Sequence, residues 1–187
     1  MFLTLLIICV TAGAVLAVVK QVTDAPIQQV TDAQQQQAIR KVLPEFDSLK
    51  TEKKALETPP VQSVFHKEKA ADSLLLYRAF RKGEPVGTAV ETFTEKGFGG
   101  SIRMMAGFLT DGSIYKTCVL SHAETPGLGS KMTDADFYRQ FEGRHPAQFR
   151  LQVKKDGGDV QAITAATISS RAYCDALNTA YSTVKSE

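Results

Sequence analysis

The apolar residues change along the chain from one long run to a helical repeat and then to alternation. No charged side chain occurs over residues 1–19, and this length approaches the ~20 apolar residues that cross a bilayer core. A cleaved signal peptide and a buried core helix are the alternatives. A signal peptide, however, opens with a basic region and has a shorter apolar core. We therefore predict an uncleaved transmembrane anchor over residues 1–19.

A second helix is predicted directly after this run. The segment Thr23-Asp24-Ala25-Pro26 has the capping residues and the first-turn proline that are typical of a helix start. Apolar and small residues then recur at helical spacing until Pro44, which ends the pattern. We interpret this glutamine-rich helix as a stalk and residues 45–70 as an irregular connection, so that stalk and connection together cover residues 20–70.

From Ser73 onward the pattern is typical of strands. Four strand-like runs are separated by short segments that contain glycine, and they cover residues 74–80, 85–93, 101–110 and 113–122. The pair Asp111-Gly112 between two apolar runs is a strong hairpin signal. These runs predict an antiparallel sheet.

Helices are predicted to flank this sheet. A short helix should follow Thr133-Asp134 with Phe137, Tyr138 and Phe141 on one face, and residues 149–153 alternate as a half-buried strand. The final helix should begin at about Ser170, and its apolar stripe contains Tyr173, Ala176, Leu177, Ala180 and Val184. The predicted fold class is α+β over residues 71–187, preceded by one transmembrane helix and a short stalk helix.

Charge and cysteine content exclude some functions. The formal net charge is +2 without a long basic run, which argues against nucleic acid as a partner because binding it requires a concentrated phosphate-neutralising face. The cysteines Cys9, Cys118 and Cys174 lie far apart, so we predict no zinc site or iron–sulfur cluster. We interpret them as buried small hydrophobic residues, with a Cys118–Cys174 disulfide as the alternative.

One candidate site lies in the segment Ile163-Thr164-Ala165-Ala166-Thr167-Ile168-Ser169-Ser170. Small residues allow close approach of the backbone to a ligand, and hydroxyl side chains add hydrogen bonds. The helix that begins here offers unpaired N–H groups and a positive dipole end to a phosphate. The alternative, favoured by residue chemistry alone, is an ordinary helix cap formed by Ser169 and Ser170.

A second candidate is the loop His122-Ala123-Glu124-Thr125-Pro126-Gly127-Leu128-Gly129, directly after a predicted strand. Its proline and glycines predict a rigid loop with backbone open to a ligand. An ordinary surface loop with a structural histidine is the alternative. No base, nucleophile and orienting group can be brought together by their spacing, so we predict no catalytic residue.

These residues carry a family resemblance. The segment Thr164-Ala165-Ala166-Thr167-Ile168-Ser169-Ser170 resembles the Ser/Thr-Gly-Ala-Thr-x-x-Ser flavinylation motif of the FMN-binding domain family. Gly97-Phe98-Gly99-Gly100, Asp111-Gly112 and the loop from His122 to Gly129 match that family in order and spacing. The resemblance covers essentially the whole chain and is strongest to the G subunits of Rnf ion-translocating electron transport complexes. Their relative is the C subunit of the sodium-pumping NADH:quinone oxidoreductase.

The resemblance implies a covalently bound flavin. In this family a flavin transferase joins FMN to the second threonine of the motif through a phosphoester bond, and the matching residue is Thr167. The residues implied to bind the cofactor with it are Thr164, Ala165, Ala166, Ser169, Ser170, Glu124, Thr125, Gly127 and Leu128. Met104 or Met105 could cover the ring as well, with a plain core role as the alternative.

Two residues depart from the family pattern. Ala165 replaces the usual glycine, and Gln161 stands where an aspartate is common. An alanine is strained at that position if its φ is positive.

The implied function is electron relay. As a translocase subunit without a complete catalytic cycle of its own, the protein would pass electrons between reduced ferredoxin and NAD⁺ while Na⁺ or H⁺ moves across the membrane. Its expected partners are the other subunits of an Rnf-type complex, the flavin transferase and the bacterial inner membrane, with the soluble domain on the periplasmic face. The alternatives are the flavin subunit of a sodium-pumping quinone reductase and a tethered binding module that has lost its flavin.

Overall fold

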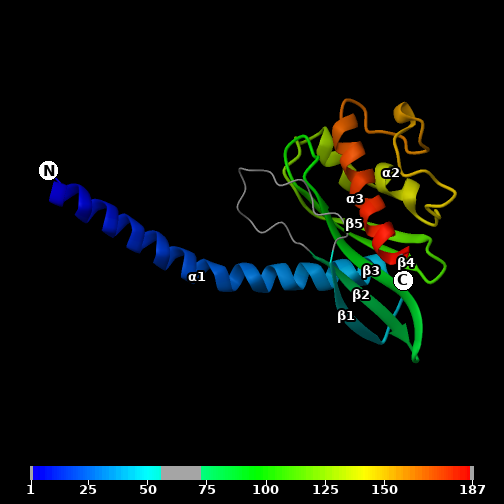
Figure 1. Cartoon of the computed structure of the whole chain (residues 1–187), viewed down its shortest axis with the longest axis horizontal. Helices are drawn as coiled ribbons and strands as arrows, with labels where there is room; N and C mark the ends of the chain where they lie inside the picture. Colours follow the sequence, from blue (N-terminus) through cyan, green and yellow to red (C-terminus); the bar gives the residue numbers. More distant parts are fainter. Residues whose placement is uncertain (1, 56–72, 186–187) are drawn as a thin grey trace. The chain divides into compact units, whose positions relative to one another are not determined.

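The computed structural model describes residues 2–55 and 73–185 (Figure 1). The chain divides into two compact units, Met1–Gln37 and Ala38–Glu187, and each is described by itself. The elements follow in the order α1 (Phe2–Val42), β1 (Ser48–Ala55), β2 (Ser73–Arg81), β3 (Glu84–Thr94), β4 (Ile102–Leu109), β5 (Ile114–His122), η1 (Gly129–Thr133), α2 (Ala135–Tyr138), η2 (Arg139–Phe141), η3 (Lys154–Asp156) and α3 (Thr167–Lys185). The predicted α+β class is confirmed.

The N-terminal residues form one helix instead of two. The backbone of α1 is helical without a break through residues 23–26, so the prediction of a separate stalk helix that starts there is wrong. Pro26 lacks an N–H group and removes one helical hydrogen bond, but the Ala- and Gln-rich sequence on its C-terminal side favours continuation of the helix. The predicted end is confirmed, because α1 stops at Val42, two residues before Pro44.

No helix in the part of the chain that the structure describes is both long enough and apolar enough to cross a membrane. The anchor over residues 1–19 and the domain bounds at residues 19 and 70 therefore stay predictions.

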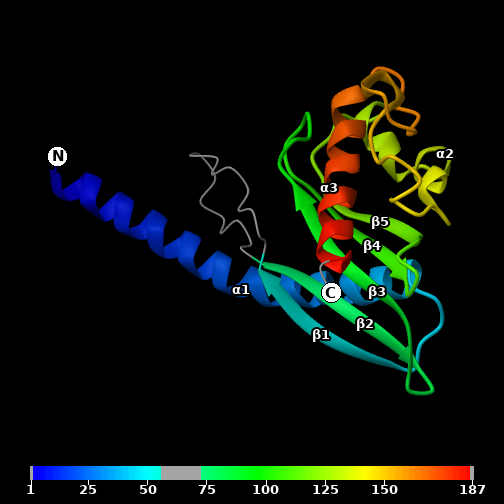
Figure 2. The same cartoon turned by 45° about the vertical axis from the view of Figure 1, so that its right-hand side comes forward.

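The second unit is built on a five-stranded antiparallel sheet in the order β1-β2-β3-β4-β5 (Figure 2). The four predicted strands are confirmed as β2 to β5. The first strand, β1, lies inside the segment 45–70 that was predicted to be irregular, and this prediction is wrong for residues 48–55. Its side chains from Ser48 to Lys53 are exposed, so it lacks the apolar alternation that reveals a half-buried strand. The remainder of the predicted connection, from residue 56, lies outside the described residues.

The hairpin turn predicted at Asp111-Gly112 is present, and a second tight turn joins β2 to β3. Lys82 and Gly83 join β2 to β3 with φ angles of 53° and 86°, the two positive values that a type I′ turn requires. Asp111 supports the turn between β4 and β5, because its Oδ1 accepts hydrogen bonds from Ser113 N at 2.9 Å and from Ser113 Oγ at 2.6 Å.

The sheet is covered on both faces. Helix α3 packs against β3 and β4 on one face, and the predicted apolar stripe of this helix is confirmed (Figure 2). Residues 38–43, the end of α1 and the residue that follows it, pack against the other face. Because both faces of β4 are covered, Met104 and Met105 are fully buried, one in each layer. The suggestion that either methionine covers a flavin is therefore wrong, and both belong to the core.

The connection between β5 and α3 carries the predicted short helix. It forms as α2 followed by η2, with Phe137 and Phe141 buried. Both rings contact the ring of Tyr173 on α3, each with centroids 5.1 Å apart. This aromatic cluster fixes the connection to the helix that carries the candidate site.

The strand predicted over residues 149–153 does not form. Leu151 and Val153 are buried, and Arg150 and Gln152 are exposed, so the alternation is real. The only ladder contact is an isolated parallel bridge between Val153 and Val160. The segment folds back locally instead, since Arg150 N donates to Asp159 Oδ2 at 2.8 Å.

All three cysteines are free, so the Cys118–Cys174 disulfide is wrong. Cys174 is buried and Cys118 is half-buried, whereas Cys9 is exposed, contrary to the expectation of burial. Burial raises the pKa of the Cys174 thiol to about 12.

Candidate functional site

Helix α3 begins at Thr167, three residues earlier than the sequence predicted. The hydrogen bond from Ser170 N to Ala166 O, at 3.1 Å, closes its first turn. The N–H groups of Thr167, Ile168 and Ser169 consequently have no acceptor within the helix. Together with the positive end of the helix dipole, they form a place where an anion is favoured.

A tight turn leads into this helix. Ala166 N donates to Ile163 O at 3.0 Å, and Ala165, the third residue of the turn, has φ of 61°. A positive φ at this position is typical of a type II turn and is normally supplied by glycine. Ala165 therefore adopts the strained conformation that was the unfavourable case in the sequence analysis.

Ser170 fixes the turn to the helix. Its Oγ accepts a hydrogen bond from Ile163 N at 3.0 Å and donates one to Ala166 O at 3.0 Å, and the residue is fully buried. Ser170 thus acts as a support of the backbone. The side chain that is left half-exposed at the start of the helix is Thr167.

A buried carboxylate joins the three sequence segments that carried the family resemblance. Glu124, from the loop after β5, is 5% exposed. Its Oε1 accepts a hydrogen bond from Gly99 N at 3.1 Å, and its Oε2 accepts one from Ser169 Oγ at 2.6 Å. The segments 97–100, 122–129 and 163–170 therefore meet at one side chain.

Gly129 packs directly against this junction. A Cβ atom at Gly129 would lie 2.4 Å from Glu124 Oε2 and 2.5 Å from Ser169 Oγ. Such distances exclude any side chain here unless the junction opens. The glycine is thus required for close packing between the loop and α3.

The loop after β5 is held by its own hydrogen bonds, as its composition predicted. Thr125 O accepts from Leu128 N at 3.2 Å and from Ser130 N at 3.3 Å. Gly127 has φ of 76°, and its N–H donates to Ser130 Oγ at 2.9 Å. His122 has the structural role that was the alternative for it, because its Nδ1 accepts a hydrogen bond from Glu124 N at 3.2 Å.

The predicted site residues divide into two groups by exposure. Those that are buried and support the backbone are Glu124, Ala166, Ser169 and Ser170. Those with side chains or backbone open to a ligand are Thr125, Gly127, Leu128, Thr164, Ala165 and Thr167. The departure at Gln161 lies outside the junction, because its hydrogen bonds to described residues are made by its backbone N–H and C=O, both with the side chain of Gln140.

Sequence reasoning missed two exposed apolar side chains. Phe98 is 70% exposed and Ile168 is 47% exposed, and Leu128 of the predicted set is 42% exposed. Each of the three directly precedes a residue at the junction, respectively Gly99, Ser169 and Gly129. A phenylalanine between glycines in segment 97–100 was the available signal for the first of them.

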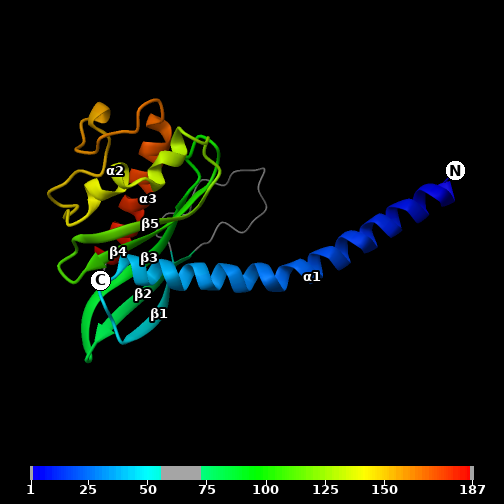
Figure 3. The same cartoon turned by 180° about the vertical axis from the view of Figure 1, so that it is seen from behind.

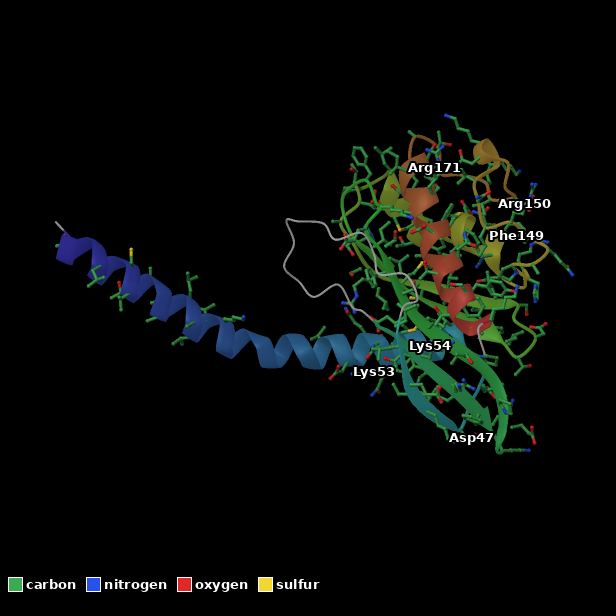
Figure 4. The ribbon with its side chains drawn as sticks, viewed as in Figure 1. Asp47, Lys53, Lys54, Phe149, Arg150 and Arg171 are labelled. Atoms are coloured by element: carbon green, nitrogen blue, oxygen red, sulfur yellow. The ribbon has the colours of Figure 1, made fainter. Side chains whose placement is uncertain are left out.

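Charged side chains lie one to two turns along α3. Arg171, labelled in Figure 4, makes a bidentate ion pair with Asp156, and both N–O distances are 2.7 Å. The hydrogen bond from Arg171 lowers the pKa of Asp156 below its ordinary value. Lys96 Nζ contacts Asp175 Oδ1 at 2.6 Å, and a cleft of about 420 Å³ lies between these pairs and Ile168.

Comparison with known proteins identifies the family. The sequence model of the FMN-binding domain matches residues 97–182, which contain all three segments of the junction. The chain is 33% identical to the G subunit of the ion-translocating oxidoreductase complex of Methanosarcina acetivorans, over 98% of this chain and 93% of that protein. The G subunit from Vibrio parahaemolyticus is 33% identical over 90% of this chain and 80% of its own length.

Two further comparisons are partial. The G subunit of Erwinia tasmaniensis is 41% identical, but the alignment covers 54% of this chain and about half, 51%, of that protein. The crystal structure of Shewanella oneidensis NqrC is similar in fold, with a TM-score of 0.53 and 20% identity over 75% of this chain and 86% of that one. The alignments with the Methanosarcina acetivorans and Vibrio parahaemolyticus proteins, together with the matched domain, show that the chain belongs to the family of G subunits of ion-translocating oxidoreductase complexes and contains an FMN-binding domain.

Proposed function

We propose that this protein carries FMN, bound through its phosphate to Thr167 Oγ1, and relays electrons within an Rnf-type ion-translocating oxidoreductase complex. The observation that carries the proposal is the junction at Glu124, which brings three segments together beside the half-exposed Thr167 at the start of α3. The names and extents of the related G subunits support the same role.

The residues at the start of α3 fit the phosphate end of FMN. Unpaired N–H groups of the first helical turn and the helix dipole favour a dianion there. Thr167 has the hydroxyl that a phosphoester requires, with no hydrogen bond to hold it among the described residues. The bond formed would join Thr167 Oγ1 to phosphorus while a bond from phosphorus to another oxygen breaks, so that the hydroxyl proton and that oxygen leave, a net loss of one water from Thr167 and FMN.

The exposed apolar side chains fit the ring end. Phe98, Leu128 and Ile168 offer apolar surface next to the junction, and the isoalloxazine ring is a flat, largely apolar group. The exposed Thr125 hydroxyl and the carbonyl of Gly127 can hydrogen-bond its polar edge. Because Glu124 has donors on both carboxylate oxygens, we assign it to holding these segments in place instead of contacting the ring.

The cofactor supplies the redox chemistry when bound, and the protein positions and tunes it. A covalent link keeps FMN in place where free FMN is scarce. Attachment to a membrane would confine the flavin to a thin layer near its partner subunits and raise its effective concentration there.

We further propose that residues 1–19 anchor the protein in the bacterial inner membrane, with the folded domain on the periplasmic side. Two observations support the anchor. The run has no charged residue, and its length is close to the ~20 apolar residues that a helix needs to cross a bilayer core. To test the topology, Thr110→Cys can be introduced into a variant without the natural cysteines and labelled with an impermeant thiol reagent in spheroplasts. Protection of this exposed position would place the domain on the other side.

Flavin attachment is tested with a matched pair of variants made together with the flavin transferase. The wild-type protein should show a fluorescent flavin band after denaturing electrophoresis, and its mass should exceed the sequence mass by one FMN less one water. Thr167→Ala should lose both signals, while Thr164→Ala, which also removes an exposed hydroxyl of the segment, should keep them. Undiminished fluorescence of Thr167→Ala would overturn the assignment.

The quinone-reductase flavin subunit remains the second candidate because the fold of NqrC is similar. Co-purification of the tagged protein with its membrane complex, followed by assays with ferredoxin and with quinone, separates the two. The strained Ala165 is the feature that favours a module without flavin, and a colourless wild-type protein in the gel assay would support that alternative.

A further inference from the structure

The outer edge of β5 is an unpaired strand edge. Within the described ranges of the chain, only its first residue is paired on this side with the segment after η2. Ile114 N donates to Arg144 O at 2.9 Å, and Gly143 N donates to Ile114 O at 2.7 Å. From Tyr115 to Val119, no backbone group makes a backbone hydrogen bond outside the β4 ladder among the described residues. An unpaired edge is a template for another strand.

A groove of about 820 Å³ runs along this edge. One of its walls is the end of α1 with the turn after it, and the other is formed by η1, α2 and η2, which lie beside β5 (Figure 3). Its floor includes the consecutive residues from Tyr115 to Val119. Because side chains from both faces of the sheet line it, the groove follows the strand edge itself.

The groove is basic at its rim and apolar inside. Arg40, Lys41, Lys116 and Arg139 are exposed in its lining, and none has an acidic partner within ion-pair distance among the described residues. Of its two carboxylates, Glu45 is already paired with Arg81 at 3.3 Å. The apolar lining comes from Leu43, Phe46, Val119 and Met132.

We propose that this groove docks an extended acidic segment of a partner protein, which adds as a sixth strand to β5. Backbone hydrogen bonds along the edge would supply affinity, and the four cations would select acidic side chains. A second copy of this chain fits poorly, because its own β5 would bring another Lys116 into an already cationic groove. The proposal is independent of flavin attachment, so the Thr167→Ala protein should bind the segment unchanged.

The opposite edge of the sheet provides an internal control. β1 is also an edge strand and also basic, with exposed Lys50 and Lys53, the latter labelled in Figure 4 together with its neighbour. Cationic side chains are thus common to both edges, whereas the groove with apolar lining described above lies at β5. Because this groove guides the segment in the proposal, strand addition should occur at β5 and spare β1.

The test uses the full-length protein in a non-ionic detergent and the synthetic peptide acetyl-(Glu-Val)₄-amide with a fluorophore. Anisotropy should show saturable binding that weakens with salt, and amide exchange should slow within residues 115–119. No binding, equal binding of acetyl-(Lys-Val)₄-amide, or protection confined to β1 would each overturn the proposal.

Backbone methylation tests the geometry of docking. Alternate residues of a strand direct their N–H groups to opposite edges. Of two peptides N-methylated at either the Glu or the Val positions, one should therefore lose at least tenfold in affinity and the other should retain binding. Equal affinities of the two would refute strand addition, and displacement of both by inorganic pyrophosphate would assign the groove to a small anion instead.

Charge variants test the rim. The double variant Lys116→Glu with Arg139→Glu should weaken the peptide at least tenfold, while Lys155→Glu, an exposed charge reversal outside the groove, should have no effect. A peptide-sensitive dimer of the wild-type protein in analytical ultracentrifugation would overturn the proposal in favour of a second copy. Thermal unfolding of each variant verifies that it is folded.

Discussion

The turn before α3 contains an alanine whose replacement by glycine should stabilise the protein. Ala165 occupies a position with φ of 61°, and its side chain is exposed. Replacing it by glycine removes a Cβ atom from a conformation that costs an L-residue about 1–2 kcal/mol. Because the side chain is exposed, the substitution removes little packing.

The unfolded state offsets part of this gain. Glycine gives the unfolded chain more conformational freedom than alanine, which costs about 0.4–1 kcal/mol. The net stabilisation expected for Ala165→Gly is therefore about 0.5–1 kcal/mol. For a protein of this size the melting temperature should rise by about 1–4 °C.

Thermal unfolding by circular dichroism measures this shift, and Ala166→Gly is the matched control. Ala166 is the neighbouring alanine, is 7% exposed and has no positive φ, so its glycine variant should lose stability by about 1 kcal/mol. A second readout is the rate of flavin attachment by the transferase, which should rise in Ala165→Gly because the turn is relieved of strain. If both glycine variants lower the melting temperature equally, the inference that Ala165 is strained by its positive φ is refuted.

Three other predictions follow from the junction and the buried thiol. Ser169→Ala should lower the free energy of unfolding by about 2 kcal/mol, because the buried Glu124 carboxylate loses a donor, and denaturant unfolding measures this; a change within ±0.3 kcal/mol would contradict it. Thr125→Ala should leave flavin attached while it shifts the absorption spectrum or potential of the flavin; an unchanged spectrum, potential and turnover would argue against a role at the ring. Burial raises the pKa of Cys174 to about 12, so above pH 9 the thiol ionises in the unfolded state first and this group's contribution to stability declines. Iodoacetamide at pH 8 should accordingly modify Cys174 only upon unfolding, and modification of the native protein at the rate of Cys9 would contradict the buried position.

The sheet could be predicted largely from the sequence because β2 to β5 are runs rich in apolar residues that short glycine-containing segments separate, although β3 and β4 are buried on both faces and do not alternate. β1 could not be, since its outward edge and mostly exposed residues leave no apolar pattern. The reverse error occurred at residues 149–153, where alternation of burial is present without a partner strand. Alternation reports which side chains are buried, and it does not report what the backbone bonds to.

The site was predicted in part for a related reason. The resemblance predicted one site from Thr167 and the loop after β5, and Glu124 does connect the two segments, but it did not predict which residues support the backbone. Glu124 was expected to bind the cofactor, whereas both of its carboxylate oxygens accept hydrogen bonds from the protein itself. Contacts between residues 25 and 45 positions apart depend on how the loops pack, and no local pattern encodes them.

At the junction, residues that support the backbone alternate with residues whose side chains are exposed. Gly99, Gly129 and Ser169 pack at Glu124, and the residue before each of them is an exposed apolar side chain. In each of the three segments, a residue that packs at the buried Glu124 is thus preceded by an exposed apolar side chain. The buried polar centre at Glu124 is therefore linked to the exposed apolar residues Phe98, Leu128 and Ile168. A substitution at any of the three inner positions should move its outer neighbour, so flavin properties should respond to residues that never touch the flavin. If the outer residues line the ring as proposed, a change in their shape would tune the ring environment while the buried centre keeps the three segments together.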